Sequence, residues 1–356
     1  MIDWTSTMQQ TFEYYVVDPG TWTDVRKLDT VLSSSISRDS GAETLGSASI
    51  SMSEILGECY IRIYLIAIQN GFRQKVPLGT YMIQSPRYSF DGKSKSISLD
   101  AYTPLIELKE KHPPLGYSLS INDNIMDMAT LILRENVRAP IVMNKMEDTL
   151  YTNFVANLDD TWLIFLKDLI ANANMQFGLD EMGRIIFTPI QDVSTLQPVW
   201  TFDASNSSIL YPNFDIEHDL YGIPNEVEVI YSTGEASKSV KVTNDNPNSP
   251  VSTVSRGRRI TYRITNPDIV GEPSDEQIED YAKRVLKSMS SIQYTVSYKH
   301  GYCPVRVGDC VRLNYESAGL KNVKAMVTSQ SIECTPGCPV TEKAIFTNDL
   351  WEGDTR

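Results

Sequence analysis

The stretch Gly57-Glu58-Cys59-Tyr60-Ile61-Arg62-Ile63 opens a run of strand-forming residues and has an imperfect copy late in the chain. The copy is Gly308-Asp309-Cys310-Val311-Arg312-Leu313, which aligns with the first once a slip of one residue is allowed. In both, a turn with a glycine and an acidic residue opens a strand. Such self-similarity predicts two structural modules of the same kind in one chain.

The similarity continues downstream of both copies. Gly79-Thr80-Tyr81-Met82-Ile83-Gln84-Ser85 follows the first, and Lys324-Ala325-Met326-Val327-Thr328-Ser329-Gln330 follows the second. A further strand closes each set, at Ile97–Ala101 and at Ala344–Thr347. Two interpretations stay open at this point. The chain contains two barrels of similar topology, or short strands after Gly-acid turns look alike by chance.

Residues 1–104 have the composition of strands separated by turn residues. Lys95–Asp100 alternates apolar and polar residues, which is typical of a strand with one buried face. Phe90-Asp91-Gly92-Lys93 supplies the Asp-Gly pair of a hairpin turn. We therefore expect a small β-barrel or sandwich. Its expected strands are Thr11–Val17, Ala48–Met52, Tyr60–Ile68, Thr80–Tyr88 and Ser96–Ala101.

Residues 105–198 predict an α+β insert with two amphipathic helices and a hairpin. One helical stripe follows Asn122 or Asp123, either of which can cap it, and the other follows the pair Asp159-Asp160, interpreted as its cap. The hairpin has the turn Asp180-Glu181-Met182-Gly183 between Met175–Leu179 and Arg184–Thr188. The stripes comprise Ile125, Met128, Ala129, Ile132 and Leu133, then Trp162, Phe165, Leu166, Leu169 and Ile170.

After Pro198 the strand pattern returns, with Val227, Val229 and Tyr231 alternating with other residues. We assign residues 199–235 and 289–350 to a second barrel and residues 236–288 to another insert. In that insert, Ser237–Arg259 is expected to be a mobile polar loop. Ser274 and Gln277 form a capping box for a helix with the stripe Ile278, Tyr281, Ala282, Val285 and Leu286. The remaining expected strands are Ile292–Lys299, Cys310–Tyr315, Ala325–Glu333 and Glu342–Thr347.

Composition sets limits on the class of protein. The 356 residues suggest two or three domains, and 41% hydrophobic content is that of a globular chain. No apolar run approaches the ~18–20 residues of a membrane helix, and the N-terminus lacks the features of a secretory signal. The net charge of −13 argues against stable nucleic-acid binding. The cluster Arg256-Gly257-Arg258-Arg259 is interpreted as a solvated turn.

The cysteines do not suggest a disulfide framework, because their number is odd: Cys59, Cys303, Cys310, Cys334 and Cys338. Cys334-Thr335-Pro336-Gly337-Cys338 has roughly the spacing of a zinc knuckle but lacks a tight second pair. We interpret this segment as a Pro-Gly turn with two incidental thiols. We expect no metal site and no cofactor.

Catalytic motifs are also missing from the sequence. His112, His218 and His300 lie outside known ligand patterns, and no nucleophile elbow, phosphate-binding loop or dinucleotide fingerprint is present. Cys303 lies near His300, but neighbours along a strand end seldom face one another. Glu217 and Asp219 stay unassigned, and Asp180-Glu181 is explained as a turn. We expect no enzymatic activity.

Several segments, taken in order, resemble the baseplate hub proteins of tailed phages and phage-derived particles. The likeness spans roughly residues 10–350, and its motifs are moderately specific only as an ordered set. These motifs are Pro77–Ile83, Ser98–Tyr102, Asp160–Leu163, Ala171–Asn174, the hairpin with Asp180 and Gly183, Ile223–Val229, the polar loop, the Ser274 helix and Val307–Val311. The family shares its fold with the N-terminal half of type VI secretion spikes and of siphophage tail-associated proteins.

The resemblance implies two barrels related to the tail-tube fold, plus inserted subdomains. It also implies a homotrimer whose six barrels offer a pseudo-sixfold face to the tail tube or distal tail protein. Further implied partners are a central spike or tape-measure protein and other baseplate proteins, with DNA only in transit and no membrane insertion. The location would be the virion tail tip, after synthesis in the bacterial cytoplasm. The family's hub portion has no catalytic residues, so none is carried over.

A trimer would carry a charge of −39, which fits a channel that does not adsorb DNA. Two other interpretations compete with the hub. One is a tail-associated cell-wall hydrolase or glycan-binding component, and the other is a multidomain β protein unrelated to phages.

Overall fold

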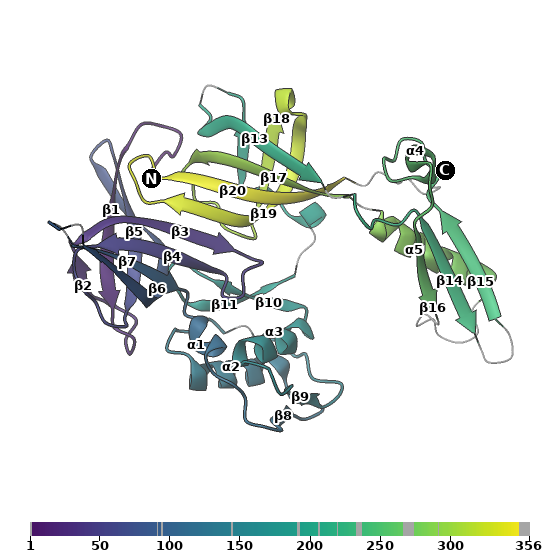
Figure 1. Cartoon of the computed structure of the whole chain (residues 1–356), viewed down its shortest axis with the longest axis horizontal. Coiled ribbons are helices and arrows are strands. Elements are labelled where there is room, and N and C mark those ends of the chain that lie inside the picture. The colour runs from purple at the N-terminus through teal and green to yellow at the C-terminus, as the bar shows by residue number, and fades with distance from the viewer. Residues whose placement is uncertain are drawn as a thin grey trace. The chain divides into compact units, whose positions relative to one another are not determined.

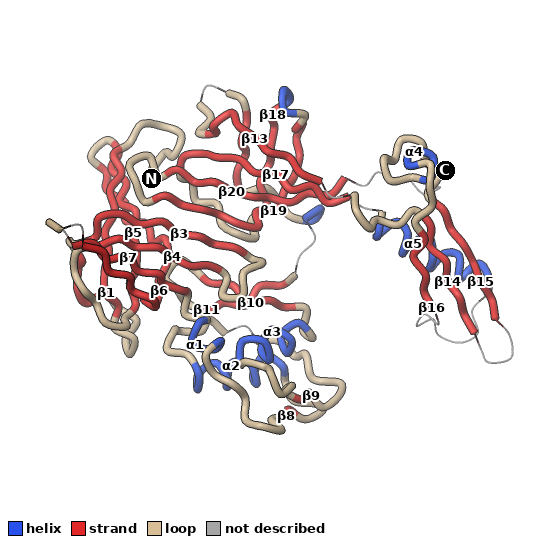
Figure 2. Tube along the Cα trace, in the orientation of Figure 1, coloured by secondary structure: helices blue, strands red, loops and turns tan. Residues whose placement is uncertain are grey.

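The computed structural model describes residues 2–90, 92–93, 95–143, 145–190, 193–205, 207–218, 220–232, 237–265, 274–290 and 292–348. Two compact units are present, Met1–Phe214 with Ser297–Ala344 and Asp215–Val296 with Ile345–Arg356. Strands dominate and pair mainly antiparallel, which confirms a mainly β fold with α+β inserts (Figure 2). Among the described residues, no helix is long and apolar enough to cross a bilayer.

The first module is formed by seven strands near the N-terminus. They are β1 (Gln9–Val17), β2 (Asp24–Leu28), β3 (Val31–Asp39), β4 (Gly46–Met52), β5 (Tyr60–Gln69), β6 (Phe72–Phe90) and β7 (Lys95–Tyr102). Their order in the sheet is β3-β4-β7-β6-β5-β1-β2, with antiparallel pairing throughout. All five strands expected here are confirmed, whereas β2 and β3 were not predicted. Phe90 pairs with Lys95 across the expected hairpin turn, of which Asp91 lies outside the described residues.

The second module consists of six strands that come later in the chain. They are β12 (Trp200–Asp203), β13 (Leu210–His218), β17 (Ile292–Gly301), β18 (Cys310–Tyr315), β19 (Leu320–Glu333) and β20 (Pro339–Asn348). Their order is β13-β17-β20-β19-β18-β12, in which β12 pairs parallel with β18. A single-turn 3₁₀ helix, η2 (Glu316–Ala318), connects β18 to β19. All four strands expected between Ile292 and Thr347 are confirmed.

The two modules repeat one strand order. Six strands of each module correspond in their order along the chain and in their order across the sheet. They are β1, β3, β4, β5, β6 and β7 in the first module and, respectively, β12, β13, β17, β18, β19 and β20 in the second. β2 has no counterpart, and β1 pairs antiparallel with β5 where β12 is parallel to β18. The similar sequences around Gly57 and Gly308 therefore lie at equivalent places in a repeated topology, which is hard to reconcile with chance similarity.

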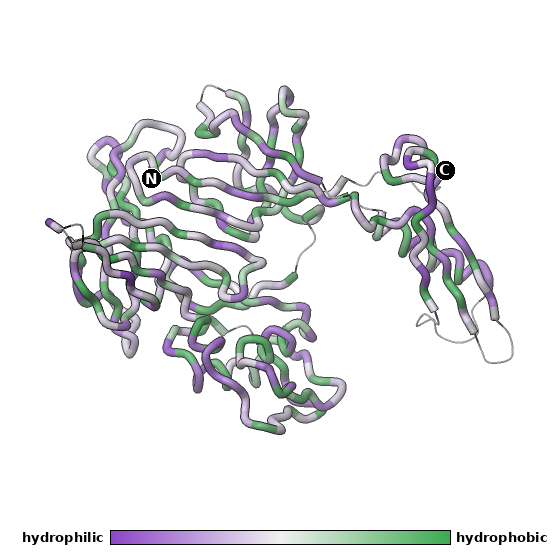
Figure 3. The backbone as a smooth tube through the Cα atoms, in the orientation of Figure 1, coloured by the Kyte–Doolittle hydropathy of each residue, from purple (hydrophilic) through white to green (hydrophobic). Residues whose placement is uncertain are grey.

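Pairing of β3 with β19 joins the modules into one sheet (Figure 1). Ser35–Asp39 runs antiparallel to residues 329–333, with Ile36 opposite Ile332. Both isoleucines are buried in a core that also contains Ile50, Leu99 and Val340. Figure 3 shows that apolar and polar stretches both occur along the strands of this joined sheet.

The α+β insert contains the predicted helices and hairpin. Its elements are α1 (Ile106–Lys109), β8 (Ser118–Leu119), α2 (Ile125–Asn136), β9 (Phe154–Val155), α3 (Trp162–Ala171), β10 (Met175–Leu179), β11 (Ile185–Pro189) and η1 (Val193–Thr195). The helical stripes pack into one core with Phe177 and Phe187 of the hairpin. Both predicted caps are wrong. Asn124 caps α2 and Thr161 caps α3. Each has an extended backbone, so its side chain can accept a hydrogen bond from the backbone amide three residues later.

The hairpin turn of the insert is anchored on the first module. The Met182 carbonyl oxygen accepts hydrogen bonds from Trp22 Nε1 at 2.8 Å, Thr80 Oγ1 at 3.0 Å and Arg62 Nη2 at 3.2 Å. Arg62 is only 1% exposed, and its guanidinium also donates to Asp24 at 2.8 Å. A buried charge is tolerated only when it is paired and fully hydrogen-bonded, so this contact fixes the turn in place.

The second unit holds a three-stranded sheet in the order β15-β14-β16, packed by a helix. Its elements are β14 (Glu226–Ser232), β15 (Ser237–Thr243), α4 (Thr253–Arg256), β16 (Thr261–Thr265) and α5 (Asp275–Met289). The strand at Val227 was expected in the second barrel but pairs with β15 and β16 instead. The prediction of a mobile loop at 237–259 is wrong, because β15 and α4 form there and Asn244 is fully buried. The Ser274–Gln277 capping box and the α5 stripe are confirmed.

Replacing Gly183 should destabilise the first unit. Its φ is +75°, and a Cβ there would lie 2.6 Å from Thr80 Cβ. The combined backbone and steric penalty of Gly183→Ala is expected to lower the free energy of unfolding by about 2–4 kcal/mol, measured by urea denaturation. The matched control is Gly92→Ala, which has φ +89° but open space around it. Its expected cost is only about 1–2 kcal/mol, and equal losses would contradict the anchoring contact.

Removing the capping box should destabilise the second unit. Ser274 Oγ accepts from the Gln277 amide, and the Ser274 amide donates to Gln277 Oε1 at 2.9 Å. Ser274→Ala is expected to cost about 1 kcal/mol in thermal unfolding. Ser288→Ala, at an exposed site inside the same helix, should cost nothing because alanine is the better helix former. A larger loss from Ser288→Ala would contradict the capping role.

Candidate functional site

His300, Cys303 and Glu342 come together in the second module. Cys303 Sγ lies 3.8 Å from His300 Nδ1, and His300 Nε2 lies 3.3 Å from Glu342 Oε1. The expectation that Cys303 and His300 would not face one another is wrong, because the chain turns after Gly301 at the end of β17. Glu342, which was not singled out, also accepts from Tyr298 Oη and Gln330 Nε2, both at 2.6 Å.

This cluster resembles a thiol–imidazole–carboxylate triad but lacks its chemistry. His300 and Glu342 are 0% exposed and Cys303 is 2% exposed, so no substrate reaches them. Burial raises the pKa of the Cys303 thiol, and the Glu342 carboxylate raises it further, so the sulfur stays protonated at neutral pH. A nucleophilic cysteine needs the opposite shift. The cluster is therefore part of the interior, where Glu342 accepts the hydrogen bonds of Tyr298 and Gln330.

Cys334 and Cys338 are buried thiols of the interior. Cys334 and Cys338 lie in the core shared with the first module, and the Cys338 amide donates to the Thr335 carbonyl at 2.8 Å across the Pro-Gly turn. Burial raises the pKa of Cys334 to about 11. Within the part of the chain that the structure describes, no three His, Cys, Asp or Glu side chains are grouped to hold a metal ion.

Most of the acidic residues singled out from the sequence accept hydrogen bonds from nearby backbone amides and so stabilise turns. Asp160 Oδ2 accepts from the Asn157 amide at 2.8 Å, and Asp180 Oδ1 accepts from the amides of Met182 and Arg184. Glu217 is exposed on β13, and Asp219 lies outside the described residues.

The Arg256–Arg259 cluster is also mostly engaged within the second unit. Arg256 donates to the carbonyls of Ile223 at 2.8 Å and Leu220 at 2.7 Å. Arg259 pairs with Glu226 at 3.2 Å. Arg258 and Arg259 are exposed, as the interpretation of this run as a solvated turn expects.

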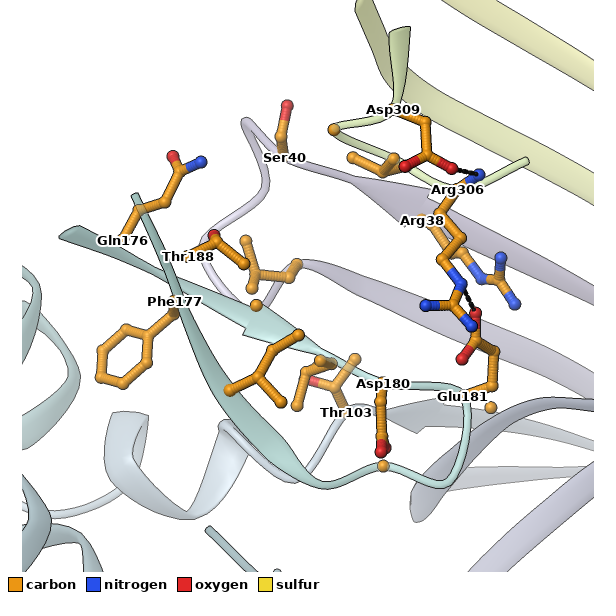
Figure 4. A pocket seen from close by; sticks show the side chains of 18 of the residues that line it. Arg38, Ser40, Thr103, Gln176, Phe177, Asp180, Glu181, Thr188, Arg306 and Asp309 are labelled. Atoms are coloured by element: carbon orange, nitrogen blue, oxygen red, sulfur yellow. Dashed lines mark hydrogen bonds and ion pairs between the residues drawn. The ribbon is translucent and has the colours of Figure 1, made fainter. Parts of the chain in front are cut away.

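A cavity of about 670 Å³ lies where the insert meets both modules (Figure 4). The β10–β11 hairpin forms one wall, and Arg38, Thr80 and Asp309 contribute to the others. Arg306 pairs with Glu181 across it, and the Arg306 amide donates to Asp309 Oδ2 at 2.8 Å. Burial raises the pKa of Asp309.

The polar side chains of this cavity form hydrogen bonds and ion pairs between the elements that line it. Arg38, for example, donates to Gln330 Oε1 at 3.0 Å and to the Leu78 carbonyl at 2.5 Å. The lining holds neither an activated nucleophile nor an unengaged pair of acids among its described charged groups. These contacts connect the hairpin of the insert with strands of both modules within the first unit.

Comparison with known proteins supports the fold. Neither a family model nor a curated protein matches this chain. Among solved structures, it is similar to a tail protein of Neisseria meningitidis MC58, with 13% identity and a TM-score of 0.64 over 96% of this chain and 98% of the other. It is also similar to the 43 kDa tail protein of prophage MuSo2 from Shewanella oneidensis, with 12% identity and a TM-score of 0.64 over 94% and 98%.

A third similar structure is the Escherichia coli c3393 protein, a type VI secretion component described as resembling the T4 tail proteins gp27 and gp5. Identity is 9% and the TM-score 0.51, over 94% of this chain and 79% of the other. These likenesses extend over nearly the whole chain and agree with the resemblance drawn from its motifs. The chain therefore has the fold of phage tail proteins and their type VI secretion relatives.

Proposed function

We propose that this protein is a structural hub of a phage tail or a phage-derived particle. The observation that carries the proposal is the strand order repeated by β1–β7 and by β12, β13 and β17–β20. Two similar modules in one chain let three chains present six similar faces with pseudo-sixfold symmetry. Such a ring adapts a hexameric tail tube to a trimeric central spike.

In this proposal, residues 1–104 are the first tube-like module and residues 105–198 the insert that stiffens it. The second module takes residues 199–218 and 292–348, because β14 pairs inside the second unit. The inserts face neighbouring baseplate proteins, while the modules contact the tube or distal tail protein and the spike or tape-measure protein. The protein is made in the bacterial cytoplasm and is carried in the virion tail tip.

DNA passes through the ring without binding it. The acidic balance of −13 per chain supports this, since like charges keep a polyanion from adsorbing. Catalysis is no part of the proposal. The one thiol–histidine–carboxylate grouping among the described residues is sealed in the interior, and in the cavity of the first unit Arg306 pairs with Glu181.

A trimer in solution tests the ring directly. Native mass spectrometry over a range of concentrations should detect a species of three times the 40.0 kDa chain. Its population should rise with protein concentration, as mass action requires. A chain that stays monomeric at every concentration, also with purified tube protein added, would contradict the proposal.

A cell-wall assay separates the hub from the hydrolase interpretation. Purified protein in a gel containing peptidoglycan should produce no clearing, because the His300–Cys303 pair is inaccessible and its thiol is protonated. Lysozyme in a parallel lane controls for the substrate. Clearing that disappears in Cys303→Ser or Glu217→Gln would favour an enzyme instead.

A further inference from the structure

The long strand β6 is paired on both edges for only part of its length. Residues 72–82 pair with β5, but residues 86–90 pair with β7 alone among the described strands. Residues 86–90 are all exposed, including Tyr88 at 49% and Phe90 at 71%. A strand edge without a pairing partner is a site for adding another strand.

The equivalent strand of the second module has this edge covered. Residues 320–326 of β19 pair with β18, as residues 72–82 of β6 pair with β5. The following residues, 329–333, pair antiparallel with β3. Hence the strand edge that lacks a partner in the first module, at residues 86–90 of β6, has an equivalent in the second module that pairs with β3 of the same chain.

The counterpart of β3 is β13, which has an unpaired edge of its own. In the sheet β13 is a terminal strand with β17 as its one neighbour among the described strands. Residues 211–213 and 215–218 are exposed, with apolar Tyr211 and Ile216 among them. Pro212 fits such an edge, because it lacks the N–H that a central strand would use. Among the described strands, none pairs with the edge of β13 that faces away from β17.

The two open edges have complementary charge. β13 carries exposed Asp215 and Glu217, and β6 carries exposed Arg87. Opposite charges on paired strands stabilise the pairing, and like charges would oppose it. This favours β13 as the strand added to β6.

We propose that β13 of one copy pairs antiparallel with residues 86–90 of β6 in a second copy. The contact is head-to-tail, so three of them close a ring in which they alternate with the three internal β3–β19 contacts. This inference rests on the proposed trimeric ring, and it names the surface through which the copies associate. It also gives the unassigned acid Glu217 a function.

Cysteine cross-linking tests the contact. The double variant Arg87→Cys/Glu217→Cys, made in a Cys59→Ser background, is treated with a short bis-maleimide and run on a denaturing gel. Covalent dimers and trimers should form, with the ladder ending at trimer. Each single-cysteine variant should stay monomeric, because the proposed pairing brings residue 87 of one copy near residue 217 of the next and not near another residue 87. The four remaining native thiols are buried, and burial raises the pKa of each, so they contribute little background: Cys303, Cys310, Cys334 and Cys338.

Charge reversal provides an independent readout. Arg87→Glu and Glu217→Lys should each raise the dissociation constant about fivefold per contact, and the combination should restore it. Lys321→Glu, an exposed site on β19 away from both edges, is the matched control and should change nothing. A trimer that neither cross-links nor responds to these changes would overturn this inference and leave the ring intact. A strictly monomeric chain would overturn both.

Discussion

The antiparallel pairing of β3 with β19 is the constraint on which the first unit depends. It places Ile36 opposite Ile332 and Arg38 opposite Gln330, so that one side of the joined sheet is core and Arg38 reaches Gln330 Oε1 and the Leu78 carbonyl. A slip of one residue would turn every one of these side chains to the other face. The register of this single contact therefore aligns two modules that lie far apart in sequence.

The pattern of apolar residues was enough to predict most elements of this fold. Alternation and β-branched residues located β5, β18 and β20, and the helical stripes located α2, α3 and α5, because these elements bury one regular face. β3 was missed since Val31–Asp39 contains four serines and resembles a loop. What makes it a strand is pairing on both sides with β4 and β19, a tertiary effect that no local pattern records.

Side-chain contacts were less predictable than elements. Nothing in the local sequence indicates that Glu342 and Gln330 would meet His300, or that the Met182 carbonyl would accept from Trp22 and Arg62. The caps failed for a similar reason. Asn122, Asp123 and Asn124 are all competent by type, and the backbone entering α2 selects Asn124. Interior contacts of this kind depend on which strands become neighbours, and that is settled only by the whole fold.

The two copies of the repeat also show how similar strands acquire different neighbours. Arg62 pairs in register with Thr80, and both donate to the Met182 carbonyl of the insert. In the second copy, Arg312 pairs in register with Lys324, whose ammonium donates to the Leu196 carbonyl at 3.2 Å, where the insert returns to the second module. The equivalent strand pair of each module thus donates hydrogen bonds to a different part of residues 105–198. The position of the contact with the insert is kept in both copies, but the residues that make it differ. The strand order is therefore retained while the sequence similarity is faint.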